Sequence, residues 1–272
     1  MYCSLRIYID KVKRQVKAQN ILDIFEVFEN MLYKSYDHIS YLLFDPDGDR
    51  TLIDEKYSYD VVGKREFLNK DILPVVVGKS GDMSSPFIEA SCESKPMQLY
   101  SKIRVQIRFP AYTQPFVICV DYEQKEEEKL TLEKYASLMK KLSAIGFHVN
   151  NSFYHVYAKK NEAFTLDGGQ SGSLLNHYER KNLKNSVMHR KAGCINRFMD
   201  IYCANSICTE LLDEKTRQQI EDIVGSENTV YDTEVFSFSI GNMQNLTSAY
   251  RVRDQRVIKK LRWLLLGSNK NR

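Results

Sequence analysis

Two acids and a lysine between residues 46 and 56 are of the types that metal-dependent nucleases use. Pro46-Asp47 is followed by Asp54-Glu55-Lys56, which matches the proline-aspartate, acid-x-lysine pattern of those enzymes. In that chemistry two carboxylates hold a divalent cation while the lysine orients or activates water. Asp47, however, falls in a predicted turn and Asp54 lies within the predicted return strand. Because a metal site needs carboxylates that converge near strand ends, a polar turn followed by a charged strand is the simpler interpretation.

A second version of the nuclease pattern uses Glu123. The sequence Glu123-Gln124-Lys125 follows an apolar run, Phe116 to Val120, that is typical of a fully buried strand. The preceding predicted strand, Ile103 to Phe109, contains no acid that could complete the site. A metal-dependent nuclease or phosphoesterase therefore stays an alternative function, with Asp47, Asp54, Lys56 and Glu123 as its candidate residues.

Other metal and acid-base patterns fail at named positions. The turn at residues 45–49 begins like a calcium loop, but Arg50 and Lys56 replace the glycine and the bidentate glutamate that this loop requires. The sequences His38-Ile39-Ser40 and His148-Val149-Asn150 are similar to the paired motif of two-histidine phosphoesterases, and only the first has the hydroxyl partner. The sequence therefore favours a non-catalytic protein that binds no cofactor and no metal.

The cysteines indicate thiols in a reducing compartment. Six cysteines are spread through 272 residues, a length that is stable without disulfides. A soft-ligand group, His189, Cys194, Cys203 and Cys208, has no Cys-x-x-Cys pair, so we interpret these thiols as buried apolar groups. The N-terminal residues carry no signal-peptide core, and no stretch approaches the roughly 20 apolar residues of a membrane span. These features predict a cytoplasmic location.

Basic charge is concentrated in the last 22 residues. The chain has a net charge of +4, but residues 251–272 contain eight basic residues against Asp254 alone, which leaves −3 for the rest. This segment is predicted to be a helix whose apolar stripe contains Leu261. The helix can dock on the protein body or a partner, or contact nucleic acid or an anionic surface. Its candidate binding residues are Arg253, Arg256, Lys259, Lys260 and Arg262.

Two hairpins and two helices are predicted in the N-terminal half. Leu5, Ile7 and Ile9 alternate as in a strand, and the following helix has Asn20 as its expected N-cap. Residues 39–44 and 51–59 form one predicted hairpin, and residues 103–109 and 116–120 form another. Arg104 and Arg108 are expected to be exposed on the second hairpin and to bind a partner. A helix from Thr131 to Gly146 is followed by β structure over residues 147–157, with a break at residues 150–151.

The C-terminal half is predicted to be helix-rich. Between the two predicted hairpins of the N-terminal half, residues 73–77 form a short expected strand, and residues 167–173 form a flexible break before the helix-rich segment. Helical patterns dominate residues 174–224, and residues 230–240 read as one strand. We predict one α+β domain over residues 1–250, with mostly antiparallel sheet built from hairpins and amphipathic helices packed on one side. Residues 251–272 form the basic helix and tail.

No motif identifies a family. In its layout of an N-terminal strand, an amphipathic helix and successive hairpins, the chain resembles some bacterial toxin-immunity proteins. That resemblance implies an inhibitor (antitoxin-type) role through binding of a protein partner, which is the function that the sequence favours. The alternatives are the metal-dependent nuclease and a nucleic-acid-binding protein that uses the basic C-terminal helix. The oligomeric state is not determined by the sequence.

Overall fold

The computed structural model describes part of the chain. The described residues are 2–12, 16–44, 50–56, 87–92, 103–109, 116–123, 130–157 and 204–240, together with 256–257, 260–261 and 264–265. Their strands are β1 (Tyr2–Val12), β2 (His38–Phe44), β3 (Arg50–Lys56), β4 (Phe87–Cys92), β5 (Ile103–Arg108), β6 (Phe116–Glu123), β7 (Phe147–Tyr157), β8 (Ala204–Cys208), β9 (Thr229–Tyr231) and β10 (Val235–Ser239).

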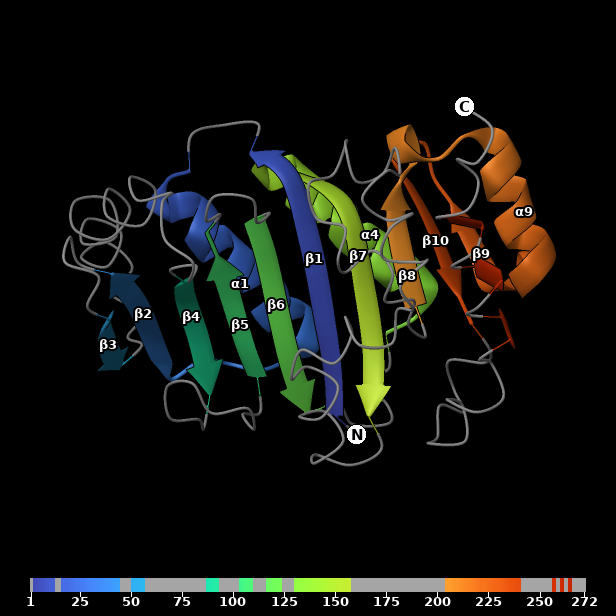
Figure 1. Cartoon of the computed structure of the whole chain (residues 1–272). Helices are drawn as coiled ribbons and strands as arrows, with labels where there is room; N and C mark the ends of the chain where they lie inside the picture. The colour runs from blue at the N-terminus through green and yellow to red at the C-terminus, as the bar shows by residue number, and fades with distance from the viewer. Residues whose placement is uncertain are drawn as a thin grey trace.

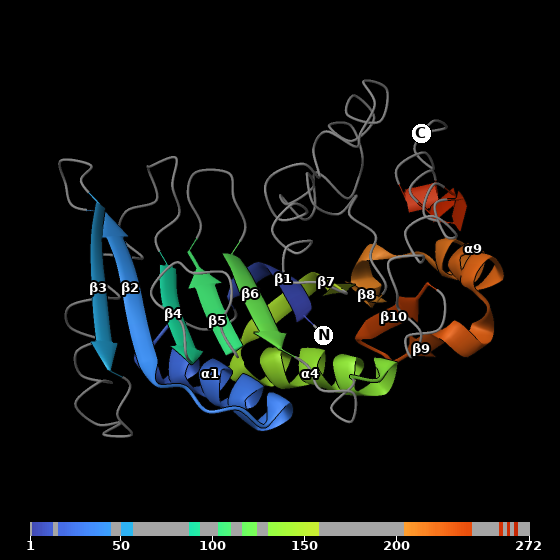
Figure 2. The same ribbon diagram turned by 90° about the horizontal axis from the view of Figure 1, so that it is seen from below.

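These strands form a single antiparallel sheet. Its order is β3-β2-β4-β5-β6-β1-β7-β8-β10-β9 (Figure 1). The helices α1 (Ala18–Leu32) and α4 (Leu132–Ile145) lie side by side on one face of the sheet (Figure 2). The predicted α+β class, with antiparallel hairpins and amphipathic helices on one side, is confirmed.

The first strand lies in the middle of the sheet. Leu5, Ile7 and Ile9 of β1 are buried in the core beneath the helices, as their alternation predicted. On either side β1 pairs with β6 and β7, which follow it by more than 100 residues along the chain. The centre of the sheet is therefore built from contacts that are distant in sequence.

The start of α1 lies earlier than the sequence predicted. The N-cap is Lys17, not Asn20, and Asn20 occupies the third helical position. Its side-chain oxygen accepts a hydrogen bond from the Lys17 backbone N–H at 3.0 Å, and its amide nitrogen donates to the Ile145 carbonyl at 3.3 Å. Asn20 therefore satisfies one donor at the start of α1 and one carbonyl at the end of α4.

The limits of α4 are those that the sequence predicted. Thr131 Oγ1 accepts a hydrogen bond from the Lys134 backbone N–H at 3.3 Å, and the helix ends at Gly146 with φ 111°. This conformation favours glycine because a Cβ atom would be strained there. Strand β7 follows at once and continues through residues 150–151, where a break was predicted. Tyr8 pairs with Asn151 and Ile9 with Val149, so the irregularity is a bulge at residue 150 and not an interruption.

A helix-rich C-terminal half is not shown, because residues 158–203 and 241–255 lie outside the described residues. Residues 204–208, predicted to be helical, form β8, which is held between β7 and β10 and is buried along its whole length. Five residues are too few to distinguish a buried strand from a helix by periodicity. The helix α9 (Glu214–Val224) follows. The single strand predicted over residues 230–240 is a hairpin of β9 and β10. The predicted strand 73–77 and flexible segment 167–173 lie outside the described residues.

A second, smaller core covers the other face of the sheet at its β8–β10 end. It joins side chains from β1, β6, β8, β10, α9 and the C-terminal segment, including Tyr8, Val117, Ile220, Phe236, Phe238, Leu261 and Leu265. The described residues of the C-terminal segment are helical, and Leu261 is fully buried. The apolar stripe of this segment therefore docks on the protein body. Within the described residues, no helix has the length and apolar character needed to cross a membrane.

Candidate functional site

The described candidate nuclease residues lie on two strands of the sheet, β3 and β6. Asp54 pairs with Ser40 and Lys56 with His38, which places both residues on β3 at one edge of the described sheet. Glu123 is exposed at the end of β6. Asp47 lies outside the described residues.

The sheet order separates Asp54 from Glu123. Strands β2, β4 and β5 lie between β3 and β6, and neighbouring strands are about 4.8 Å apart, so the two strands are separated by about 19 Å. Carboxylates that share one cation lie within two metal–oxygen bonds of each other, or about 5 Å. The two versions of the predicted site therefore cannot combine into one metal centre.

Arg104 is not the exposed binding residue that the sequence predicted. It is only 5% exposed, and its guanidinium forms an ion pair with Asp121, the residue directly opposite on β6. The other oxygen of Asp121 accepts a hydrogen bond from Arg6 Nη1 of β1 at 3.0 Å. One buried carboxylate therefore joins two arginines from the strands on either side.

Glu89 extends these interactions to β4. Its Oε2 accepts a hydrogen bond from Gln106 Nε2 at 2.8 Å, and Gln106 in turn accepts one from the half-buried Arg108. Glu89 Oε1, which is also buried, accepts no hydrogen bond in the structure's described part. We call the side chains of Arg6, Glu89, Arg104, Gln106 and Asp121 the buried ionic cluster.

Burial dominates the electrostatics of this cluster. Desolvation raises the pKa of Glu89 above its usual range, although Arg104 and the Gln106 hydrogen bond oppose the shift. Desolvation lowers the pKa of the Arg104 guanidinium, but the carboxylates of Asp121 and Glu89 outweigh this effect, so the pKa is raised. Arg104 therefore remains charged, whereas burial disfavours the charged form of Glu89.

The cluster was not predicted from the sequence, because alternation assigns side chains to the two faces of a strand but does not show which face is covered by other elements. Arg104, Gln106 and Arg108 alternate along β5, and this pattern was interpreted as a solvent-exposed face. The usable signal was the presence of Asp121 and Glu89 in otherwise apolar strands, where a charge needs a buried partner. Buried charge pairs are often neutral or costly for stability compared with apolar packing. The cluster is best described as a structural element.

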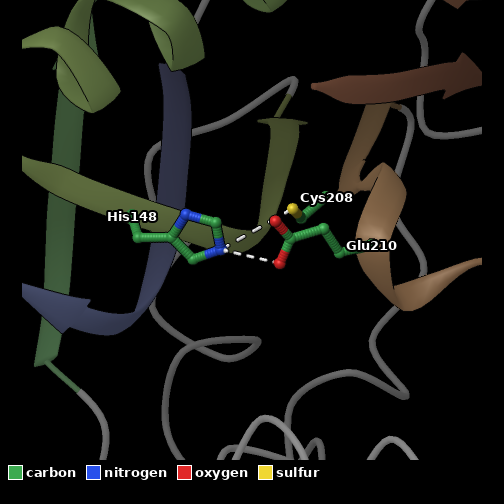
Figure 3. A group of neighbouring side chains, drawn as sticks. All are labelled: His148, Cys208 and Glu210. Carbon is green, nitrogen blue, oxygen red and sulfur yellow. Dashed lines mark hydrogen bonds and ion pairs between the residues drawn. The ribbon is translucent and has the colours of Figure 1, made fainter. Parts of the chain in front are cut away.

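A second group of chemically active side chains lies where β7 meets β8. His148 Nε2 is 3.7 Å from Cys208 Sγ and 3.7 Å from Glu210 Oε2 (Figure 3). His148 comes from β7, Cys208 ends β8, and Glu210 belongs to the 3₁₀ turn at Thr209–Leu211. Each residue offers one ligand atom, and these atoms lie within 4.8 Å of one another.

The predicted soft-ligand group is not the one that the fold assembles in the described part of the chain. Cys208 belonged to that group, whereas His148 was considered only as an acid-base histidine. The described cysteines Cys3, Cys92, Cys119 and Cys208 are thiols, as expected. His189, Cys194 and Cys203 lie outside the described residues.

The predicted basic binding residues are only partly described. Arg256 and Lys260 are exposed on the C-terminal segment, while Leu261 beside them is buried. Arg253, Lys259 and Arg262 lie outside the described residues. The described part of this segment thus presents charge to solvent and apolar side chains to the second core.

Comparisons with known proteins add a distant structural likeness. No family model matches the chain, and no curated protein matches it. Among solved structures, the chain is similar to the Pseudomonas aeruginosa T6SS protein PA0821, with 10% sequence identity and a TM-score of 0.49. The match covers 97% of this chain and 74% of that protein.

Proposed function

We propose that this chain is a non-catalytic protein that binds a protein partner, with an inhibitor role of the bacterial immunity (antitoxin) type. The choice of partner is carried by one observation, the acidic character of residues 209–234, whose exposed and half-exposed side chains we call the acidic surface. This segment contains eight carboxylates and two basic side chains, a net charge of −6. All eight carboxylates belong to exposed or half-exposed residues, namely Glu210, Asp213, Glu214, Glu221, Asp222, Glu227, Asp232 and Glu234.

The acidic surface favours a basic protein over nucleic acid. Complementary charge accelerates the encounter with a cationic surface and disfavours partners of like charge. Phosphates carry the same sign as these carboxylates and would be repelled. Lys140 of α4 pairs with Asp232 and lowers the pKa of that carboxyl, and Arg217 pairs with Glu214 and Glu221. Because the segment has eight carboxylates and two basic side chains, its charge stays strongly negative after these pairs are formed.

The packing of the basic C-terminal segment also favours this proposal over a nucleic-acid-binding protein. Leu261 and Leu265 are buried in the second core, so the apolar face of this helix is already occupied. The exposed Arg256 and Lys260 need no nucleic acid to explain them, because charged residues are usual on the solvent face of a docked helix. The immunity role itself is what the resemblance in the layout of strand, helix and hairpins implies.

Charge reversal tests the proposal directly. The protein is purified from its native host under mild conditions, and the partner recovered in fixed stoichiometry is identified. The variant Asp222→Lys/Glu234→Lys changes two exposed acids of the acidic surface, and Glu26→Lys/Glu133→Lys makes the same change of charge on α1 and α4. We expect the first variant to weaken the complex at least tenfold, chiefly through slower association, and the second to leave its affinity unchanged.

Two outcomes contradict the proposal. Equal loss of affinity in both variants would show that net charge, not this surface, controls binding. A partner-free monomer with metal-dependent nuclease or phosphoesterase activity that disappears in Asp54→Asn would instead support the alternative based on Asp47, Asp54 and Lys56.

A further inference from the structure

The three side chains at the junction of β7 and β8 have the chemistry of a zinc site. We propose that His148, Cys208 and Glu210 bind one zinc ion through Nε2, Sγ and a carboxylate oxygen. A thiolate, an imidazole and a carboxylate are each established zinc ligands. A site with three protein ligands leaves one coordination position for water or another donor.

The distances fit tetrahedral coordination. With usual zinc bond lengths of about 2.0–2.3 Å, tetrahedral geometry places a nitrogen and a sulfur ligand about 3.6 Å apart and a nitrogen and an oxygen about 3.4 Å apart. The corresponding distances are 3.7 Å for His148 to Cys208 and 3.7 Å for His148 to Glu210. A zinc ion would therefore need to draw His148 Nε2 and each of the other two ligand atoms together by only a few tenths of an ångström. The Cys208 sulfur and the Glu210 oxygen, which lie within 4.8 Å of each other, would have to approach to about 3.6 Å.

The direction of the contacts favours a metal over a nucleophilic triad. In a triad one imidazole nitrogen faces the nucleophile and the other is held by the acid. Here Cys208 and Glu210 both approach Nε2 of His148 (Figure 3). Convergence of three ligand atoms on one point is the arrangement that a cation requires. Cys208 is also only 5% exposed, which hinders its attack on a substrate.

The backbone holds the ligands in place. The bulge at residue 150 lies between His148 and the start of the β7–β8 pairing at Asn151, and bulges commonly redirect nearby side chains. Thr209, between the other two ligands, donates its backbone N–H to the Glu234 carbonyl at 3.0 Å and its hydroxyl to the Thr233 carbonyl at 2.8 Å. These hydrogen bonds anchor the 3₁₀ turn to the residues that lie directly before β10, so little ordering is left for the metal to impose.

The position of the site suggests a structural clamp. Strands β7 and β8 are joined by only four residue pairs, from Asn151–Ile207 to Tyr154–Ala204. His148 and Cys208 lie beyond the same end of this short ladder. A metal held by both residues would extend the connection between the central strands and the β8–β10 end of the sheet. Zinc binding should therefore increase resistance to unfolding, since it stabilises the folded state alone.

Cobalt substitution provides the test. The full-length apo protein is titrated with Co²⁺ and then with Zn²⁺, and thiolate ligation is detected by the sulfur-to-cobalt charge-transfer band. We expect one Co²⁺ per chain, a band that zinc abolishes, and a higher unfolding temperature with zinc. In Cys208→Ser the band should disappear and zinc affinity should fall at least about a hundredfold, because even outer ligand partners contribute 10–100-fold. Cys92→Ser, a thiol on β4, is the matched control and should behave as the wild type.

A surface variant keeps the test valid if the buried cysteine variant does not fold. The Glu210 side chain is 77% exposed, so Glu210→Gln should leave the stability of the apo protein unchanged while weakening zinc binding at least tenfold. Absence of the cobalt-thiolate band in the wild type, its persistence in Cys208→Ser, or wild-type zinc affinity in Glu210→Gln would each overturn the proposal.

Discussion

Arg6 Nη1 donates a hydrogen bond to Asp121 Oδ1 at 3.0 Å, and it does so diagonally across the sheet. Arg6 stands opposite Cys119 in the β1–β6 register, so it reaches past its direct neighbour to the acid two residues further along. Arg104 lies directly opposite Asp121 on β5 and pairs with its second oxygen. A single carboxylate thus connects three adjacent strands at the centre of the sheet.

Removing this carboxylate should destabilise the protein strongly. Asp121→Asn leaves Arg6 and Arg104 buried without their shared counter-charge, and we expect a loss of about 3–5 kcal/mol in the free energy of unfolding. Urea denaturation at neutral pH measures it. Glu123→Gln, an exposed change two residues along β6, should stay within about 0.5 kcal/mol of the wild type.

An apolar replacement of the whole triad separates charge from packing. If the cost comes from uncompensated arginines, Arg6→Met/Asp121→Leu/Arg104→Met should be more stable than Asp121→Asn. A triple variant at least as unstable as the single one would show that packing, and not charge, dominates at this position.

The buried Glu89 should make stability depend on pH. Desolvation raises the pKa of Glu89 in the folded protein. At a pH between the unfolded and the folded pKa, Glu89 is therefore protonated in the folded state and ionised in the unfolded chain. The stability of the wild type relative to Glu89→Gln is therefore greatest below the unfolded pKa and falls as pH rises through the folded pKa. Urea denaturation of both proteins across this pH range measures the difference. The exposed change Glu133→Gln should show no such trend, and parallel profiles for wild type and Glu89→Gln would refute the assignment.

The C-terminal segment should contribute to folding. Leu261 is fully buried in the second core, so Leu261→Ala should lower the free energy of unfolding by about 2–5 kcal/mol. Its exposed neighbour Lys260 provides the control, and Lys260→Ala should change stability by no more than about 0.5 kcal/mol. Thermal or urea unfolding distinguishes the two. Equal effects would mean that the segment does not dock as described.

Nucleic-acid binding should be tested by charge reversal and not by deletion. Removing residues 251–272 would also remove Leu261 and Leu265 from the core, so lost binding could simply reflect unfolding. Arg256→Glu/Lys260→Glu changes only exposed side chains. We expect neither wild type nor variant to bind DNA or RNA specifically at physiological salt. Tight binding by the wild type, with a salt dependence that weakens in the variant, would restore the nucleic-acid alternative.

Local patterns predicted the elements whose determinants are close in sequence. The helix α4 begins after Thr131 and ends at Gly146 because the cap and the positive φ are properties of those residues. Hairpins were predicted from alternation and turn residues for the same reason. The prediction failed where the determinant was distant. Asn20 forms hydrogen bonds at the start of α1 and at the end of α4 instead of being the N-cap of α1. Residues 204–208 form the strand β8 because β7 and β10 pair with them on either side.

The sequence by itself determined the class of the fold, the limits of α4 and the concentration of basic charge at the C-terminal end. Only the tertiary structure decided that Arg104 is buried beside Asp121 and that His148 meets Cys208, 60 residues further along the chain. The physical reason is that a period of two assigns side chains to opposite faces of a strand. Which face is covered, and which strand lies beside it, depends on pairing between segments that are far apart in sequence.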